Sequence, residues 1–186
     1  CGDGAVANLL IETFNELVKV TGIDYDLRAI RWAKTFSKDP ENFICGDIKD
    51  LNSVTYESAS LIEVFEHIPP AEAVIFVENI AMSLKEGANL IVTVPTTEVP
   101  LTPKHYRHFD FKTLQTCFQP HFKVVDKFAF VKTNAVTRNL SKLSSNKYWY
   151  FESQFLSRYL VGTYSKKHKE INGCARICIA SNAAQS

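Results

Sequence analysis

The sequence lacks the features that would carry it into or across a membrane. No apolar run approaches the roughly 18 residues that a membrane-spanning helix needs, and we expect no signal peptide. The formal net charge is only +1, so there is no overall field that would attract nucleic acid or an anionic membrane. Any such partner would have to bind a local patch.

A disulfide framework is also missing. The five cysteines are odd in number and include no Cys-x-x-Cys pair. This pattern is typical of free thiols in a reducing compartment. We therefore expect a cytoplasmic protein without structural disulfides.

What is present is an ordinary globular composition, with 46% apolar and 22% charged residues. The length of 186 residues suits one hydrophobic core, so we expect a single domain over residues 1–186. A helix that follows a glycine turn needs a preceding strand. Because the sequence starts inside such a turn, at Cys1 to Gly4, we expect the domain to lack its first strand at the N-terminus.

Apolar periodicity predicts an alternation of helices and strands. Helices are expected at Ala5–Val18, Arg28–Phe36, Ala71–Leu84 and near Phe111–Phe118, and short strands at Lys19–Asp24, Phe43–Cys45, Ala59–Val64 and Ala88–Val94. We expect Gly87 to end the third helix. Two later runs, Phe122–Val131 and Ala175–Ser181, predict an antiparallel C-terminal hairpin. The alternation indicates an α/β fold with a doubly wound, mostly parallel sheet.

Two glycines precede the first predicted helix, and polar residues follow the first two predicted strands. Gly2 and Gly4 allow a tight turn before the first helix. Asp24 ends the next strand, where a carboxylate can accept bonds from two ribose hydroxyls. Gly46 to Ile48 follows the strand at Phe43–Cys45 and would read an adenine edge. Together these segments predict an adenosine site.

The order of CGDG, GIDYD, CGDI, EVFEHIPP and LKEGANLIVTVP resembles the motif series of class I S-adenosylmethionine-dependent methyltransferases, within the UbiG- and UbiE-like, type 11/12 group. The resemblance implies that the glycine loop lies under the methionine part of the cofactor S-adenosyl-L-methionine, that Asp24 holds its ribose, and that Asp47 and Ile48 meet its adenine. The residues expected to bind the cofactor are Cys1, Gly2, Asp3, Gly4, Asp24, Tyr25, Gly46, Asp47, Ile48 and Glu63.

The resemblance also implies the reaction. The cofactor's sulfonium activates the methyl group, so the protein has mainly to position a nucleophile. We expect a small-molecule acceptor, a metabolite or sugar-like compound, methylated on a hydroxyl. A histidine near neutrality is the natural base for a hydroxyl, and the candidates are His67, His105 and His108.

Two acids and a histidine form a Glu-x-x-Glu-His cluster at Glu63, Glu66 and His67. With His105 or His108 it could ligate a divalent cation, as in the similar cluster of metal-dependent small-RNA 3′-terminal 2′-O-methyltransferases. The same run is common in small-molecule methyltransferases without a metal, and the chain shows no strong basic character for RNA. We expect no metal and no nucleic-acid partner.

Two further alternatives come from other functional classes. An NAD(P)-dependent oxidoreductase would also explain the spacing of Gly2, Gly4 and Ala7, but not Gly46 and Asp47. A non-catalytic cofactor-binding scaffold could lose Asp24 or Gly4 without penalty, and this chain has kept both.

Residues 134–172 are expected to form a helical insertion that covers the acceptor side. The segment is rich in aromatic residues and has seven basic residues against two acidic ones, which leaves a net charge of +5. Three alternatives stay open for its surface: packing on the domain, contact with a membrane or a lipid-linked substrate, and a homodimer interface.

Overall fold

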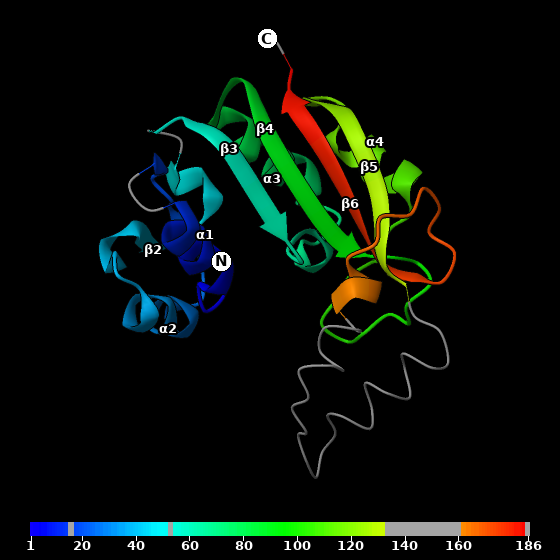
Figure 1. Cartoon of the computed structure of the whole chain (residues 1–186). Helices are drawn as coiled ribbons and strands as arrows, with labels where there is room; N and C mark the ends of the chain where they lie inside the picture. The colour runs from blue at the N-terminus through cyan, green and yellow to red at the C-terminus, as the bar shows by residue number, and fades with distance from the viewer. Residues whose placement is uncertain (15–16, 52–53, 133–160, 185–186) are drawn as a thin grey trace. The chain divides into compact units, whose positions relative to one another are not determined.

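A computed structural model describes residues 1–14, 17–51, 54–132 and 161–184. The chain divides into two compact units, Cys1–Thr55 and Tyr56–Ser186. Figure 1 shows the elements of both units. The prediction of one domain over residues 1–186 stays a prediction.

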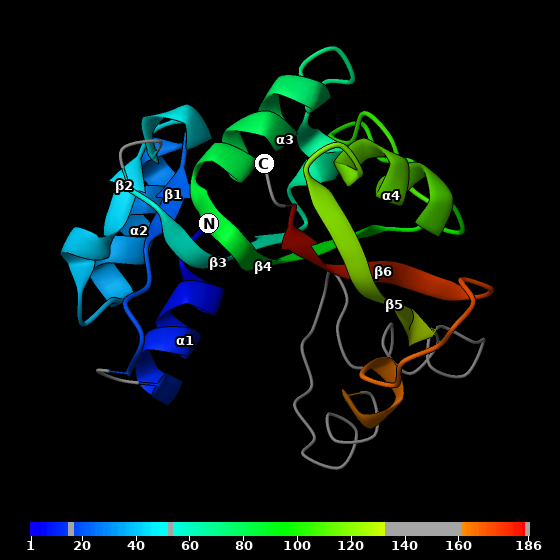
Figure 2. The same ribbon diagram turned by 90° about the horizontal axis from the view of Figure 1, so that it is seen from above.

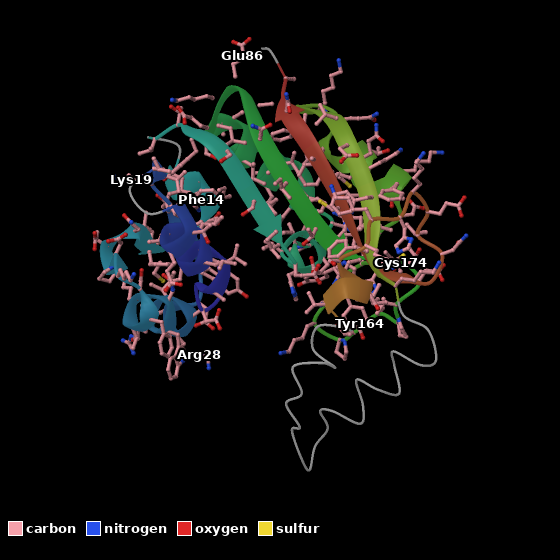
Figure 3. All side chains as sticks on the ribbon, viewed as in Figure 1. Phe14, Lys19, Arg28, Glu86, Tyr164 and Cys174 are labelled. Atoms are coloured by element: carbon pink, nitrogen blue, oxygen red, sulfur yellow. The ribbon has the colours of Figure 1, made fainter. Side chains whose placement is uncertain are left out.

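The first unit contains a short parallel sheet with two helices. Its elements are α1 (Ala5–Phe14), β1 (Gly22–Asp24), α2 (Leu27–Phe36), β2 (Phe43–Cys45) and two 3-10 turns, Pro40–Asn42 and Ile48–Leu51. The Asp26 side chain accepts a hydrogen bond from the Arg28 amide and so caps α2. Figure 3 shows Arg28 at the start of that helix. The core of the unit consists of Ala7, Ile11, Ile30, Ala33 and Phe43.

The second unit contains a four-stranded sheet in the order β3-β4-β6-β5. Its elements are β3 (Tyr56–Ile62), a 3-10 turn (Phe65–His67), α3 (Ala73–Met82), β4 (Leu84–Pro95), α4 (Phe111–Phe118), β5 (Phe122–Lys132) and β6 (Cys174–Ala183). Strands β3 and β4 are parallel, and β6 runs antiparallel to both β4 and β5. Helices α3 and α4 cover the same face of the sheet (Figure 1 and Figure 2).

These elements confirm the predicted α/β class and the antiparallel pairing of the last two strands. Several predicted boundaries shift by a few residues, and the predicted helix end at Gly87 is wrong. Helix α3 ends at Met82, and Gly87 lies inside β4 with a left-handed φ of 72°. Leu84 pairs with Tyr56 but Asn89 pairs with Ser58, so β4 has extra residues that bulge at this point. Glycine adopts this φ without steric strain, and Figure 3 shows the neighbouring Glu86 pointing outward.

Two helices leave large apolar side chains exposed beside their buried faces. In α1 the buried residues are Ala7 and Ile11, whereas Leu9 is 61% exposed. In α3, Val77 and Ile80 are buried but Val74 is 71% exposed. The small side chain of Ala7 permits close contact between α1 and its neighbours. The spacing of apolar residues in the sequence does not indicate such a contact.

Most of the predicted insertion at 134–172 lies outside the described residues. Residues 161–164 are helical. Within the ranges that the structure describes, no helix is both long enough and apolar enough to cross a membrane.

Candidate functional site

In the first unit, the turn at the start of α1 is bonded directly to the end of β1. One carboxylate oxygen of Asp24, Oδ2, accepts hydrogen bonds from the Gly2 amide at 2.8 Å and from the Cys1 amino nitrogen at 2.9 Å. The other oxygen, Oδ1, accepts one from the Asp26 amide at 2.9 Å. The Asp24 side chain is 18% exposed. The carboxylate therefore has a fixed position with one edge open to a ligand.

These contacts keep Asp24 ionised. Partial burial acts to raise its pKa, but hydrogen bonds from the Asp26 and Gly2 amides act against it, and the pKa lies below the ordinary value. Asp24 therefore presents a negative charge at neutral pH. Such a group forms charge-assisted bonds with hydroxyl donors.

The loop after β2 lies against the end of β1. Asp24 pairs with Cys45 across the parallel strands, and the Gly46 amide donates to the Asp24 carbonyl at 3.0 Å. The Asp50 carboxylate accepts from the Asp47 amide at 2.8 Å and shapes the loop. Asp47 is exposed. The structure thus brings Gly46 and Asp47 to the edge where Asp24 lies.

The two glycines of the first turn have different surroundings. Gly4 is buried with φ 81°, and a Cβ there would meet the Ala33 Cβ at 2.8 Å. Gly2 has φ 57°, and a Cβ there would meet no atom within 4 Å. Gly4 thus permits close packing of α1 on α2, whereas the backbone at Gly2 faces open space.

The remaining predicted site residues lie in the second unit, where Phe65 anchors the acidic cluster. The Phe65 ring is buried and packs against the rings of Phe109 and Phe118, with centroids 5.5 and 4.8 Å away. The next residue, Glu66, is also fully buried. Its carbonyl accepts a hydrogen bond from the Tyr106 amide at 2.9 Å, which ties the loop after β4 to this cluster.

The loop after β4 is closed by hydrogen bonds at its base. Thr96 has no exposed surface, and its hydroxyl donates to the Cys174 carbonyl at 2.5 Å and accepts from the Glu98 amide at 3.3 Å. Phe109 returns to the start of the loop, where its amide donates to the Pro95 carbonyl. These bonds hold His105 and His108 beside the acidic cluster.

The three predicted histidines come together. The ring centroids of His67 and His105 are 4.7 Å apart, and those of His105 and His108 are 5.0 Å apart. His108 Nδ1 lies 2.8 Å from the Val99 carbonyl, and His108 Nε2 lies 2.7 Å from His105 Nδ1. The structure therefore confirms that these side chains are neighbours, while their catalytic role stays a prediction.

The hydrogen-bond partners select one tautomer for each neutral ring. A carbonyl only accepts, so His108 Nδ1 carries a proton and His108 Nε2 accepts from the Nδ1–H of His105. His105 Nε2 is then left with a lone pair. By the same argument His67 donates from Nδ1 to the Lys104 carbonyl at 2.9 Å and keeps a lone pair on Nε2. Burial above all, with a smaller contribution from the Arg176 charge, lowers the pKa of His105, which favours its neutral form.

The two glutamates of the cluster have different environments. Glu63 Oε2 lies 2.5 Å from Arg176 Nε, although burial raises the pKa of Glu63 overall. Neither carboxylate oxygen of Glu66 has a hydrogen-bond partner in the described part of the chain. Burial, reinforced by the charge of Glu63, raises the pKa of Glu66 to about 7. His67 Nε2 is 3.9 Å from Glu66 Oε1.

An open hollow of about 470 Å³ adjoins His108. It is lined by Thr97, Glu98, Val99, Pro100, Leu101 and His108. Its volume falls within the range of small-molecule sites, roughly 300–1,000 Å³. The hollow is a candidate place for an acceptor beside the histidine cluster.

Sequence reasoning missed two residues that organise this cluster, Arg176 and Thr96. Arg176 pairs with Glu63 from β6, and Thr96 joins the loop to Cys174. Both contacts connect residues far apart in the chain, so no local pattern indicates them.

The sequence and the fold are both similar to those of methyltransferases. Residues 1–92 match the family described as methyltransferase domain. The fold is similar to that of a SAM-dependent methyltransferase from Archaeoglobus fulgidus, with 16% identity, a TM-score of 0.68 and coverage of 98% of this chain and 82% of that one. A SAM-dependent methyltransferase from Methanosarcina mazei has 15% identity and a TM-score of 0.66, with coverage of 100% and 90%.

The same fold also occurs in a [4+2]-cyclase, SpnF, at 16% identity and a TM-score of 0.66, with coverage of 100% of this chain and 74% of that one. No curated protein matches the sequence. The fold alone therefore leaves the acceptor open.

Proposed function

We propose that this chain is a class I S-adenosylmethionine-dependent methyltransferase and that it methylates a hydroxyl group of a small molecule. S-adenosylmethionine supplies an activated methyl group when bound. The protein has then to hold the acceptor and take up its proton. The resemblance of its motifs to UbiG- and UbiE-like enzymes supports a small-molecule acceptor.

The first unit fits the cofactor. The backbone at Gly2 faces open space, so a ligand can approach it closely at the start of α1. The Asp24 carboxylate offers about four acceptor positions, and the three bonds from Cys1, Gly2 and Asp26 leave Oδ1 able to accept from a ribose hydroxyl. Asp47 is exposed on the adjacent loop and available to the adenine. A cofactor contact of Glu63 stays a prediction.

The observation that carries the proposal for a hydroxyl is the lone pair left on His105 Nε2. The chain from the Val99 carbonyl through His108 to His105 orients the ring and makes Nε2 its basic atom. A neutral imidazole of this kind removes a proton from a hydroxyl during its attack. Lowering of the pKa of His105 keeps that nitrogen unprotonated at neutral pH.

The test is methyl transfer from radiolabelled S-adenosylmethionine to fractionated cell extract and to a panel of hydroxyl, amine and thiol compounds. We expect label in the small-molecule fraction, in a product that mass spectrometry and NMR identify as a methyl ether. Label in RNA, or on a nitrogen or sulfur atom, would contradict the proposal. Release of S-adenosylhomocysteine without any labelled acceptor would contradict it equally.

A matched pair of variants tests the base. His105→Asn should lower kcat about 10²- to 10⁴-fold while leaving the affinity for S-adenosylmethionine within a few-fold of the parent. His121→Asn removes a histidine outside the cluster and should retain kcat. If both variants turned over like the parent, His105 would not be the base.

A further inference from the structure

We propose that Glu66, His67 and His105 form a binding site for a divalent transition-metal ion such as Zn²⁺ or Co²⁺. One ligand atom from each of these residues lies within 4.8 Å of the others. The metal site goes beyond the proposed function, and it departs from the sequence-based expectation of a metal-free protein. The lone pair on His105 Nε2 cannot bind an ion and remove a proton at the same time, so we expect the ion-loaded protein to be inhibited in methyl transfer. The existence of the site does not depend on which acceptor is methylated.

Nε2 of His67 and Nε2 of His105 each have a lone pair that can bind an ion. The Lys104 carbonyl accepts a hydrogen bond from Nδ1–H of His67. His108 Nε2 accepts one from Nδ1–H of His105. Each ring is thereby left with an unprotonated Nε2. Metal-binding histidines characteristically donate their other ring N–H to a carbonyl or another acceptor, so His67 and His105 have the partners expected around a metal.

The third donor is the buried carboxylate of Glu66. Its side chain has no exposed surface, and both of its oxygens lack a hydrogen-bond partner among the described residues. A buried polar group without a partner costs free energy. A cation next to Glu66 Oε1, on the side where His67 Nε2 lies at 3.9 Å, would satisfy it.

Glu63 and His108 have other roles in this arrangement. Glu63 Oε2 forms an ion pair with Arg176 Nε at 2.5 Å. Both ring nitrogens of His108 have hydrogen-bond partners. We therefore assign His108 as the positioning residue that orients His105. The ligand set is two imidazoles and one carboxylate.

This donor set identifies the class of ion. Two imidazole nitrogens with one carboxylate oxygen suit Zn²⁺ and neighbouring first-row metals rather than Mg²⁺ or Ca²⁺, which prefer oxygen ligands. The ligand atoms have to close in by about an ångström to reach metal–ligand distances of about 2.1 Å. His67 is 42% exposed, which leaves a route for entry and open positions for water or an acceptor.

The experiment is a titration of the chelator-treated, dialysed protein with Co²⁺ alone, followed by isothermal calorimetry and by the visible absorption of the bound ion. We expect one ion per chain. NMR of the histidine side chains should show the ion on Nε2 of His67 and His105. Glu66→Gln and His105→Gln should each weaken binding at least about 100-fold, and His108→Asn about 10-fold.

Two control variants make the outcome decisive. His121→Asn, outside the cluster, and Glu63→Gln, beside it, should bind Co²⁺ within about threefold of the parent, and circular dichroism should show every variant folded. The site is overturned if the parent binds no more tightly than Glu66→Gln, and the ligand assignment is overturned if Glu63→Gln loses as much affinity as Glu66→Gln. No step of this test requires methyl transfer, so it stands apart from the test of the proposed function.

Discussion

The Gly2 amide donates a 2.8 Å hydrogen bond to the Asp24 carboxylate, and so joins the turn before α1 to the end of β1. The same carboxylate accepts from the Asp26 amide at 2.9 Å. One side chain therefore fixes the geometry of two loops. Loss of its charge should affect both the loops and the ligand that they surround.

Asp24→Asn should weaken S-adenosylmethionine binding about 10- to 100-fold, since a hydrogen bond to a charged group contributes about 1.5–3 kcal/mol. Isothermal calorimetry measures the change. The matched control is Asp39→Asn, at a residue whose side chain makes no capping hydrogen bond, and it should bind like the parent. Equal affinity of the two variants would remove Asp24 from the cofactor site.

Gly4→Ala should destabilise the protein more than Gly2→Ala. Both substitutions place alanine in the left-handed region, at a cost of about 1–2 kcal/mol. Only at Gly4 does the new Cβ meet a neighbour, the Ala33 Cβ at 2.8 Å, which adds about 1–3 kcal/mol. Urea unfolding followed by circular dichroism measures the difference, and equal midpoints for the two variants would contradict the packing of α1 on α2.

Thr96→Val should lower the free energy of unfolding by about 1–3 kcal/mol, because it leaves the Cys174 carbonyl and the Glu98 amide without their hydroxyl partner. Thr96→Ser retains the hydroxyl and should lose less. Because Thr96 begins the loop that carries His105, the valine variant should also lose turnover. Thermal unfolding and kinetics on the two variants check both effects, and a valine variant as stable as the serine variant would be inconsistent with the assigned role.

Asp110→Ala should lower the free energy of unfolding by about 0.5–2 kcal/mol at pH 7, since Asp110 caps α4. The Thr113 amide and hydroxyl, through their hydrogen bonds, hold the pKa of Asp110 below its ordinary value of 3.8. A lowered pKa in the folded state gives stability that is present above the unfolded pKa and lost as the pH falls through the folded one. The difference between parent and alanine variant should therefore shrink below about pH 4.

Asp110→Asn serves as the control for that prediction. Asparagine caps helices about as well as aspartate, so this variant should stay close to the parent at pH 7. Its stability relative to Asp110→Ala should change little with pH, because neither asparagine nor alanine titrates. Denaturant unfolding at several pH values checks it. A gap between parent and Asp110→Ala that stayed constant down to pH 2 would assign the effect to packing rather than to the carboxylate.

The sequence by itself determined the local elements and the first unit's ligand edge. Apolar periodicity located α4 over Phe111–Phe118 as the structure has it, because the spacing of buried residues in a helix is a local property. Asp24 and Gly46 also meet as expected, since parallel strands place their carboxyl ends at one edge. The predicted end of the third helix at Gly87 is wrong, because Gly87 lies inside β4, which pairs with β3 on both sides of it. Glycine often ends helices, so the local pattern favoured the wrong boundary.

Only the tertiary structure decided the chemistry of the second cluster. The sequence contained Glu63 and Glu66 as equivalent acids, yet Arg176 from β6 pairs with the first while burial isolates the second. Which nitrogen of His105 keeps a lone pair depends on His108 and, through it, on the Val99 carbonyl. Burial and hydrogen-bond partners set charge and tautomer, and they come from segments that meet only when the chain folds.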